Sequence, residues 1–189
     1  MSKVENINSE QITYYTSLPT VILTEFRDED GPTLVEYLGE DTEIHKNLRY
    51  LPQPYTLNDA KSFIQWSRDL KKEYQRHVNM AIRDKNSGKV IGSCGFDDND
   101  LKSPTEVGLG YWLGKDYWGK GIGTAVVETL TRIGFEYYGY TKLYAAIFEW
   151  NIGSQKVLLK NGFVKEKFLE NYIKKDDKLI NCVKLSKTK

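Results

Sequence analysis

Three glycines within five residues mark the place where this sequence is best suited to do chemistry. They lie in the segment Trp118-Gly119-Lys120-Gly121-Ile122-Gly123-Thr124, between a strand-like run and a run with helical spacing. Glycines at such a junction let successive backbone N–H groups turn toward one point, and the first turn of the helix adds partial positive charge. Lys115 lies close by as a second full charge beside Lys120. The loop predicts a phosphate site, although a glycine-rich turn with a purely geometric role has the same composition.

Two common nucleotide-binding motifs do not fit this loop. Residues 114–121 nearly match the P-loop of ATP-binding proteins, but Gly121 stands where that motif needs a serine or threonine for magnesium. A dinucleotide fingerprint fails as well, because the glycine after Gly119 and Gly121 is at position 123 rather than 124. The loop therefore favours a phosphate-bearing ligand other than ATP or a dinucleotide.

The elements that position this loop follow from the spacing of apolar residues. Runs of β-forming residues predict strands at 21–26, 77–83, 89–96, 107–113 and 142–148, and two more around the polar turn 174–178. Helical spacing predicts helices opened by Pro32, capped by Asn58 or Asp59, and covering 124–138 and 151–160. Interleaved strands and helices indicate one α/β or α+β domain at 19–189, after a polar N-terminal tail at 1–18.

The composition limits the classes of function. Twenty-seven basic and 26 acidic residues leave a net charge of +1, which argues against a surface built for nucleic acid or an anionic membrane. The two cysteines and two histidines match no metal-site spacing, so no metal is expected. Residues 1–10 lack the apolar core of a secretory signal, and no run is long enough to span a membrane. A cytoplasmic protein is therefore expected.

Further motifs flank the glycine loop in a characteristic order. Gly110-Tyr111-Trp112-Leu113 precedes the loop, and Asn151-x-x-Ser154 and Asn161-Gly162-Phe163 follow it. Together with Leu18-Pro19-Thr20 and Tyr55-Thr56, they resemble the GNAT superfamily of acetyltransferases, in its RimJ/RimL-like branch of N-acetyltransferases. In this resemblance, which covers about residues 18–185, Trp118 opens the family's pyrophosphate-binding motif and Gly121 and Gly123 fill its two small positions.

The resemblance implies a fold and a cosubstrate. The fold is a twisted, mixed and mainly antiparallel sheet of about six or seven strands, with about four helices and a V-shaped splay between strands four and five. The cosubstrate is acetyl-CoA, with no metal. Its pyrophosphate would contact the loop, its pantetheine arm would lie beside strand four and Asn151, and its sulfur would lie near Ser154. The residues assigned to acetyl-CoA are Tyr111, Trp112, Leu113, Trp118, Gly119, Lys120, Gly121, Ile122, Gly123, Thr124, Asn151 and Ser154.

Several of these residues also have a simpler structural interpretation. Tyr111, Trp112 and Leu113 would serve equally as ordinary packing residues of a strand. Asn151 and Ser154 would serve equally as caps at the start of a helix. The sequence leaves both interpretations open.

The resemblance also implies direct attack of an amine on the thioester, without an acyl-enzyme. Glu106 and Glu149, at the ends of the predicted fourth and fifth strands, are the candidate general bases. The tyrosine that many family members use as the acid is replaced here by Leu158, which leaves Ser154 as the candidate acid. A backbone N–H of strand four would polarise the thioester carbonyl.

The expected acceptor is a primary amine, either a protein N-terminus or a small molecule. The alternative is a catalytically inactive module of the same fold that binds acetyl-CoA as a sensor, because Leu158 departs from the common pattern. The sequence does not identify the acceptor, and it is compatible with a monomer or a homodimer.

Overall fold

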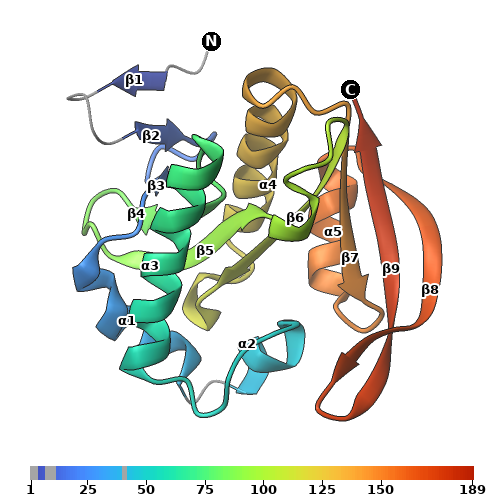
Figure 1. Cartoon of the computed structure of the whole chain (residues 1–189), viewed down its shortest axis with the longest axis horizontal. Helices are drawn as coiled ribbons and strands as arrows, with labels where there is room; N and C mark the ends of the chain where they lie inside the picture. Colours follow the sequence, from blue (N-terminus) through green and yellow to red (C-terminus); the bar gives the residue numbers. More distant parts are fainter. Residues whose placement is uncertain (1–3, 7–11, 40–41) are drawn as a thin grey trace.

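The computed structural model describes residues 4–6, 12–39 and 42–189 of the 189-residue chain. These residues form one nine-stranded sheet with helices on both faces (Figure 1). The strands are β1 (Val4–Asn6), β2 (Ile12–Tyr15), β3 (Val21–Thr24), β4 (Asn79–Asp84), β5 (Val90–Phe96), β6 (Glu106–Leu113), β7 (Lys142–Phe148), β8 (Val164–Lys175) and β9 (Lys178–Thr188). The α-helices are α1 (Gly31–Leu38), α2 (Thr42–Asn47), α3 (Leu57–Tyr74), α4 (Ile122–Arg132) and α5 (Ile152–Lys160). Short helical segments are η1 (Asp28–Asp30), η2 (Asp98–Asp100), η3 (Lys115–Tyr117) and η4 (Ile133–Tyr137).

The order of the strands across the sheet is β1-β2-β3-β4-β5-β6-β7-β9-β8. Neighbouring strands are antiparallel, except that β6 and β7 are parallel. The predicted mixed, mainly antiparallel α/β fold is therefore confirmed. Helix α2 was not predicted, because a helix of six residues is too short to establish an apolar period.

Part of the segment predicted as a polar tail is a strand. Ile12–Tyr15 form β2, which pairs with β3 and carries β1 on its other edge. Tyr14 is buried against the core, and its hydroxyl is 3.0 Å from Nδ1 of His77. A strand of four residues with one fully buried side chain is too short to show the alternation on which strand prediction depends.

The splay in the sheet lies between β6 and β7. These two strands pair only over Glu106–Gly108, opposite Lys142–Tyr144. Beyond that point β6 stays paired with β5, whereas β7 stays paired with β9, so the two strands diverge (Figure 1). The structure thus contains the predicted V between the strands expected to be the fourth and fifth.

Two apolar cores hold the helices on opposite faces of the sheet. Helices α4 and α5 pack on one face, with Val126, Leu130 and Leu158 fully buried there. Helices α1, α2 and α3 pack on the other face through a second cluster, which includes Leu34 and Ile64. Burial of apolar surface on both faces is the main force that fixes the sheet between the two helical layers.

Two helix ends differ from the prediction. Helix α3 is capped by Thr56, whose side chain accepts the N–H of Asp59, while the Asp59 carboxylate accepts the N–H of Thr56. The predicted caps Asn58 and Asp59 therefore lie inside the first turn, and the reciprocal bonds of a capping box explain why. Helix α4 begins at Ile122, two residues before the predicted start, and the chain turns at Gly139 with a φ of 77°.

Buried polar contacts tie β3 and β4 to the segments that flank them. The guanidinium of Arg83, on β4, donates from both terminal nitrogens to the carboxylate of Asp30, at 2.8 and 2.9 Å. His77 lies between the Tyr14 hydroxyl and the Glu25 carboxylate, with Nε2 2.9 Å from Glu25. Because buried charges and imidazoles are costly without partners, these contacts fix how β3, β4 and the η1–α1 segment meet.

Candidate active site

The open side of the V exposes backbone groups of β6. Gly108 and Gly114 hydrogen-bond on the β5 side, through Asp97 N to Gly108 O at 2.8 Å and Gly114 N to Ile91 O at 2.9 Å. Alternate residues of an antiparallel strand direct their peptide groups to opposite sides, so Leu109 and Tyr111 direct theirs into the gap. The V therefore offers N–H and C=O groups to a ligand.

The glycine loop is anchored to the end of β6 by its tryptophan. Trp118 Nε1 donates to the carbonyl of Leu113 at 2.8 Å, while about 41% of the Trp118 side chain stays exposed. Gly119 and Gly121 have φ values of 72° and 78°, with no atom within 4 Å of a Cβ built on either. Only glycine adopts such angles without an energetic cost. The backbone conformation therefore requires glycine at both positions, although the surroundings have room for a side chain.

The loop leads directly into α4 as an uncapped helix start. Gly121 is the N-cap and offers no side-chain cap bond, and no acidic residue lies in the first turn of α4. The N–H groups of the first turn have no partner inside the helix, and the helix dipole makes this end partially positive. The loop thus has the chemistry of the predicted phosphate site.

A cavity of about 610 Å³ lies against this loop, and we call it the loop cavity. Its walls include Leu113, Tyr117, Trp118, Gly119, Gly121, Ile122, Gly123, Thr124, Asn151, Ser154, Lys156 and Lys160. Lys156 and Lys160 lie four residues apart on α5 and bring positive charge to a wall that sequence reasoning missed. Their spacing of four residues on one helix face was a signal that could have identified them from the sequence. Lys120 instead lies with its ammonium 5.7 Å from the ring centre of Tyr117.

A second cavity, of about 570 Å³, occupies the gap of the V, and we call it the splay cavity. The two cavities share a wall that consists of Asn47, Leu48, Tyr111, Trp112, Asn151 and Ser154. Among these residues, Trp112 also packs edge-on against Tyr37 with ring centres 6.4 Å apart. Ligands in the two cavities would therefore meet the same side chains.

Three polar residues meet on this shared wall. Asn151 caps α5, because its Oδ1 accepts the N–H of Ser154 at 3.1 Å. The Ser154 side chain lies close enough to the hydroxyl of Tyr111 to affect its pKa. Burial raises the pKa of Tyr111, and the nearby Ser154 side chain lowers it only in part. The phenol hydroxyl thus stays protonated at neutral pH and is able to donate.

The position of the Tyr111 hydroxyl depends on Gly123. A Cβ built on Gly123 would lie 3.0 Å from Cε2 and 3.1 Å from the hydroxyl oxygen of Tyr111. Position 123 therefore requires glycine because the Tyr111 ring lies so close, and not because its backbone is left-handed. Leu158, which stands where many family members have the acid tyrosine, is fully buried and lines the splay cavity. The phenol on the wall shared by the two cavities therefore comes from Tyr111 instead.

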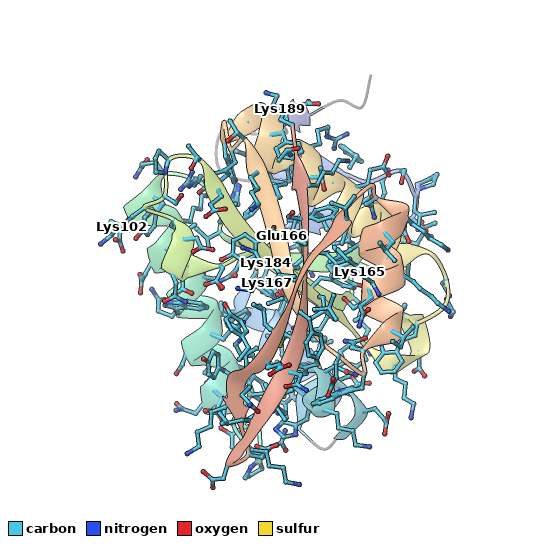
Figure 2. All side chains as sticks on the ribbon, turned by 90° about the vertical axis from the view of Figure 1, so that its right-hand side faces the viewer. Lys102, Lys165, Glu166, Lys167, Lys184 and Lys189 are labelled. Carbon is cyan, nitrogen blue, oxygen red and sulfur yellow. The ribbon has the colours of Figure 1, made fainter. Side chains whose placement is uncertain are left out.

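Neither glutamate predicted as a base lines the two cavities. Glu106 lies at the closed end of the V, 3.6 Å from the ammonium of Lys142. Lys142 also contacts Glu166, whose carboxylate contacts Lys184 as well (Figure 2). Glu149 is exposed just after β7, with its carboxylate 3.3 Å from Nδ2 of Asn181. Both carboxylates lie outside the wall where Tyr111 and Ser154 meet.

The closed end of the V is braced by a tyrosine and an aspartate that the sequence did not reveal. The hydroxyl of Tyr144, on β7, donates to Asp100 Oδ2 at 2.5 Å. The same carboxylate oxygen accepts the N–H of Gly108, on β6, at 2.9 Å. Burial and the adjacent carboxylate raise the pKa of Tyr144. Asp100 thus links β6 to β7 at the point where they begin to diverge.

Two other chemistries find no support in the part of the chain that the structure describes. Among residues 4–6, 12–39 and 42–189, no group of three or more metal-binding side chains occurs. Cys94 is buried, and burial raises the pKa of its thiol, as befits a small core residue. In the same described ranges, no helix has the length and apolarity to cross a membrane.

A splayed β6–β7 pair with a glycine loop at a helix start defines the class of acetyltransferases. Residues 20–164 match the family model described as the acetyltransferase (GNAT) domain. The chain is 32% identical to an uncharacterized N-acetyltransferase, p20, of Bacillus licheniformis, over 92% of this chain and 94% of the relative. The chain therefore belongs to the GNAT acetyltransferases and is an acyltransferase.

Solved structures show the same fold. The ribosomal-protein-S5-alanine acetyltransferase of Vibrio fischeri superposes with a TM-score of 0.79 at 22% identity, covering 91% of this chain and 94% of its own. RimJ of Mycobacterium smegmatis, solved with CoA-disulfide, superposes with a TM-score of 0.78 at 18% identity, covering 89% and 81%. The resemblance to the RimJ/RimL-like branch is thus confirmed at the level of the fold.

Proposed function

We propose that this chain transfers the acetyl group of acetyl-CoA to a primary amine by direct attack within a ternary complex. The observation that carries the proposal is the wall shared by the loop cavity and the splay cavity. A coenzyme in the first and an amine in the second would meet at Tyr111, Asn151 and Ser154. Holding both reactants at one place in a fixed orientation makes the reaction faster than a random encounter in solution.

The loop cavity fits the coenzyme. Backbone N–H groups of Gly119 to Thr124 suit the pyrophosphate, and Lys156 and Lys160 suit further phosphate charge. From the loop cavity the pantetheine arm would extend into the splay cavity, where the peptide groups of Leu109 and Tyr111 suit its amide groups. When bound there, acetyl-CoA supplies the thioester that is attacked.

The shared wall provides groups for the proton and charge movements. An N–H of Leu109 or Tyr111 in the gap is placed to polarise the thioester carbonyl, because a fixed backbone donor needs no reorganisation. The neighbouring hydroxyls of Tyr111 and Ser154 are placed to donate a proton to the departing thiolate. This assigns to the pair the acid role that the sequence gave to Ser154 alone.

The amine must lose a proton before it attacks. The predicted bases Glu106 and Glu149 lie outside both cavities, and each contacts a side chain elsewhere. We therefore assign the proton acceptor to water in the splay cavity. Glu106→Gln and Glu149→Gln should keep the wild-type dependence of kcat/KM on pH. A flattened acidic limb in either variant, where a general base becomes protonated and inactive, would restore that glutamate as the base.

Binding and turnover separate this proposal from its alternative. Calorimetry should show binding of acetyl-CoA and none of ATP. Release of the free thiol should then occur with at least one member of a panel of peptides and small amines. Acetyl-CoA binding without turnover on any amine would instead identify a sensor.

The shared wall is tested by Tyr111→Phe, Ser154→Ala and the double variant. Each loss should lower kcat, and the double variant should lower it by about 100-fold or more, the usual effect of losing an acid–base group. The Kd for acetyl-CoA should stay within about threefold in all three, because most of its proposed contacts come from backbone groups. An unchanged kcat in the double variant would remove both hydroxyls from the mechanism.

A further inference from the structure

We propose that the acceptor is a small amine that also carries a carboxylate, and that Arg49 binds this carboxylate. The inference rests on the proposed function, since it names the substrate class of the splay cavity. Arg49 is the one basic side chain among the described residues that line this cavity. Nothing in the sequence distinguished it from the other arginines, because it belongs to no motif.

Arg49 lines the splay cavity next to β8. It follows α2 in the chain and is half-buried, and its guanidinium carbon lies 5.8 Å from the ring centre of Tyr172, on β8. Tyr50 lies on a second side, with its ring centre 6.0 Å away. A separate contact, with Lys175 Nζ 3.3 Å from Nε2 of His45, also joins α2 to the β8–β9 hairpin. Stacking on aromatic rings restricts a guanidinium while leaving its N–H edge free to bond.

The partners of other arginines show what Arg49 lacks. Arg83 bonds to Asp30, Arg68 bonds to Asp28 at 2.7 Å, and Arg76 donates to a backbone carbonyl at 2.9 Å. Within the described ranges of the chain, no carboxylate lies within ion-pair distance of the Arg49 guanidinium. A planar fork of donors on a cavity wall matches the two oxygens of a carboxylate.

The aspartates of the cavity fit the other end of the same acceptor. Asp59 Oδ2 already accepts two bonds from Thr56, and Asp97 Oδ1 accepts two from Asn99. Asp98 lies on the same turn as Asp97, next to the closed end of the V. Negative charge there attracts an ammonium, whereas Arg49 attracts a carboxylate. A zwitterionic acceptor matches this distribution better than a polyamine, which would bring a second cation toward Arg49.

The test compares acceptors that differ only in the carboxylate. Glycine, β-alanine and γ-aminobutyrate are each assayed against the corresponding amide, with spermidine as a polyamine, and rates are normalised to the fraction of free amine. Wild-type protein should favour at least one acid over its amide by about tenfold or more in kcat/KM, the usual effect of charge-assisted bonds. The preferred chain length then reports the distance from Arg49 to the thioester.

Variants of Arg49 identify the residue responsible. Arg49→Gln should raise KM for the preferred acid by about tenfold or more and leave the amide within about twofold. Arg49→Lys should recover part of the loss, because it keeps the charge but not the fork. Arg68→Gln, which removes an exposed arginine paired with Asp28, is the matched control and should leave both acceptors unchanged. Binding of acetyl-CoA should be equal in all of these proteins.

Calorimetry on the CoA-loaded protein keeps the two proposals distinct. If no amine is acetylated but the preferred acid still binds, more weakly to Arg49→Gln, then the proposed function fails and the carboxylate site stands. If amides or spermidine are used as well as the acids, or if Arg49→Gln affects acid and amide equally, the carboxylate site is refuted while acetyl transfer stands. Absence of both turnover and binding would refute both proposals.

Discussion

The conformation of Gly121 gives the sharpest test of the proposed coenzyme loop. Its φ of 78° lies in the left-handed region, and no atom lies within 4 Å of a Cβ added there. Gly121→Ala therefore introduces backbone strain without a clash. Left-handed backbone costs an L-residue about 1 to 2 kcal/mol relative to glycine.

This strain must appear in one of two measurable quantities. If the loop keeps its conformation, the unfolding free energy falls by the strain minus about 0.4 to 1 kcal/mol, because alanine also restricts the unfolded chain. If the free loop relaxes instead, binding of acetyl-CoA must restore the left-handed turn. The Kd then rises by about 5- to 30-fold, which is the same strain converted to affinity.

The assay combines urea unfolding with calorimetry on the same variants. Gly88→Ala is the matched control, since Gly88 has a φ of 72°, equally open surroundings and a position in the β4–β5 turn. Gly88→Ala should lower the unfolding free energy but leave the Kd for acetyl-CoA at the wild-type value. Gly121→Asn should show a smaller effect than Gly121→Ala, because asparagine tolerates left-handed backbone.

The outcome that refutes the reasoning is a Gly121→Ala variant that is more stable than wild type and has the wild-type Kd, because alanine would then restrict the unfolded chain without straining the folded one. Such a protein would have no left-handed turn at Gly121. A Kd that rises equally in Gly88→Ala would refute the link between the glycine loop and the coenzyme. In that case the effect would report general destabilisation.

Three further predictions concern stability. Asp30→Asn leaves the buried Arg83 guanidinium without a counter-charge and should cost about 3 to 5 kcal/mol in urea unfolding. Tyr144→Phe removes a hydrogen bond to a carboxylate and should cost about 1.5 kcal/mol by the same assay. Burial lowers the pKa of His77 from its ordinary 6.5, against the opposite effect of Glu25. The unfolded chain then binds the proton more readily, so stability should fall as pH drops below 6.5, and less steeply in His77→Gln.

Each of these predictions has a contrary result, and the first two have a control. Asp28→Asn, which breaks an exposed pair, should cost less than about 1 kcal/mol, and an equal cost for Asp30→Asn would contradict the buried pair. Tyr172→Phe leaves the closed end of the V intact, so a loss matching that of Tyr144→Phe would argue against the brace. For the third prediction, a pH profile of stability in His77→Gln that matches wild type would mean that His77 is not the source of the pH dependence.

Local spacing was enough to predict most of the framework. The apolar periods located β3 to β7 and helices α1, α3, α4 and α5, because each of these elements buries one face or both. The polar turn between β8 and β9 located those two strands, since β8 is exposed along most of its length. The periods failed at β2 and α2, whose few residues cannot display a repeat. They also missed the cap at Thr56, which depends on a reciprocal bond rather than on composition.

The sequence by itself determined the glycine loop, since the need for left-handed backbone at Gly119 and Gly121 is local. Only the tertiary structure decided which side chains face the gap of the V. Tyr111 and Ser154 lie 43 positions apart on β6 and α5, yet their hydroxyls meet. Arg49 reaches Tyr172 across the same cleft, whereas Glu106 and Glu149 lie outside it. Contacts between distant segments depend on how sheet and helices pack, and no local spacing encodes that arrangement.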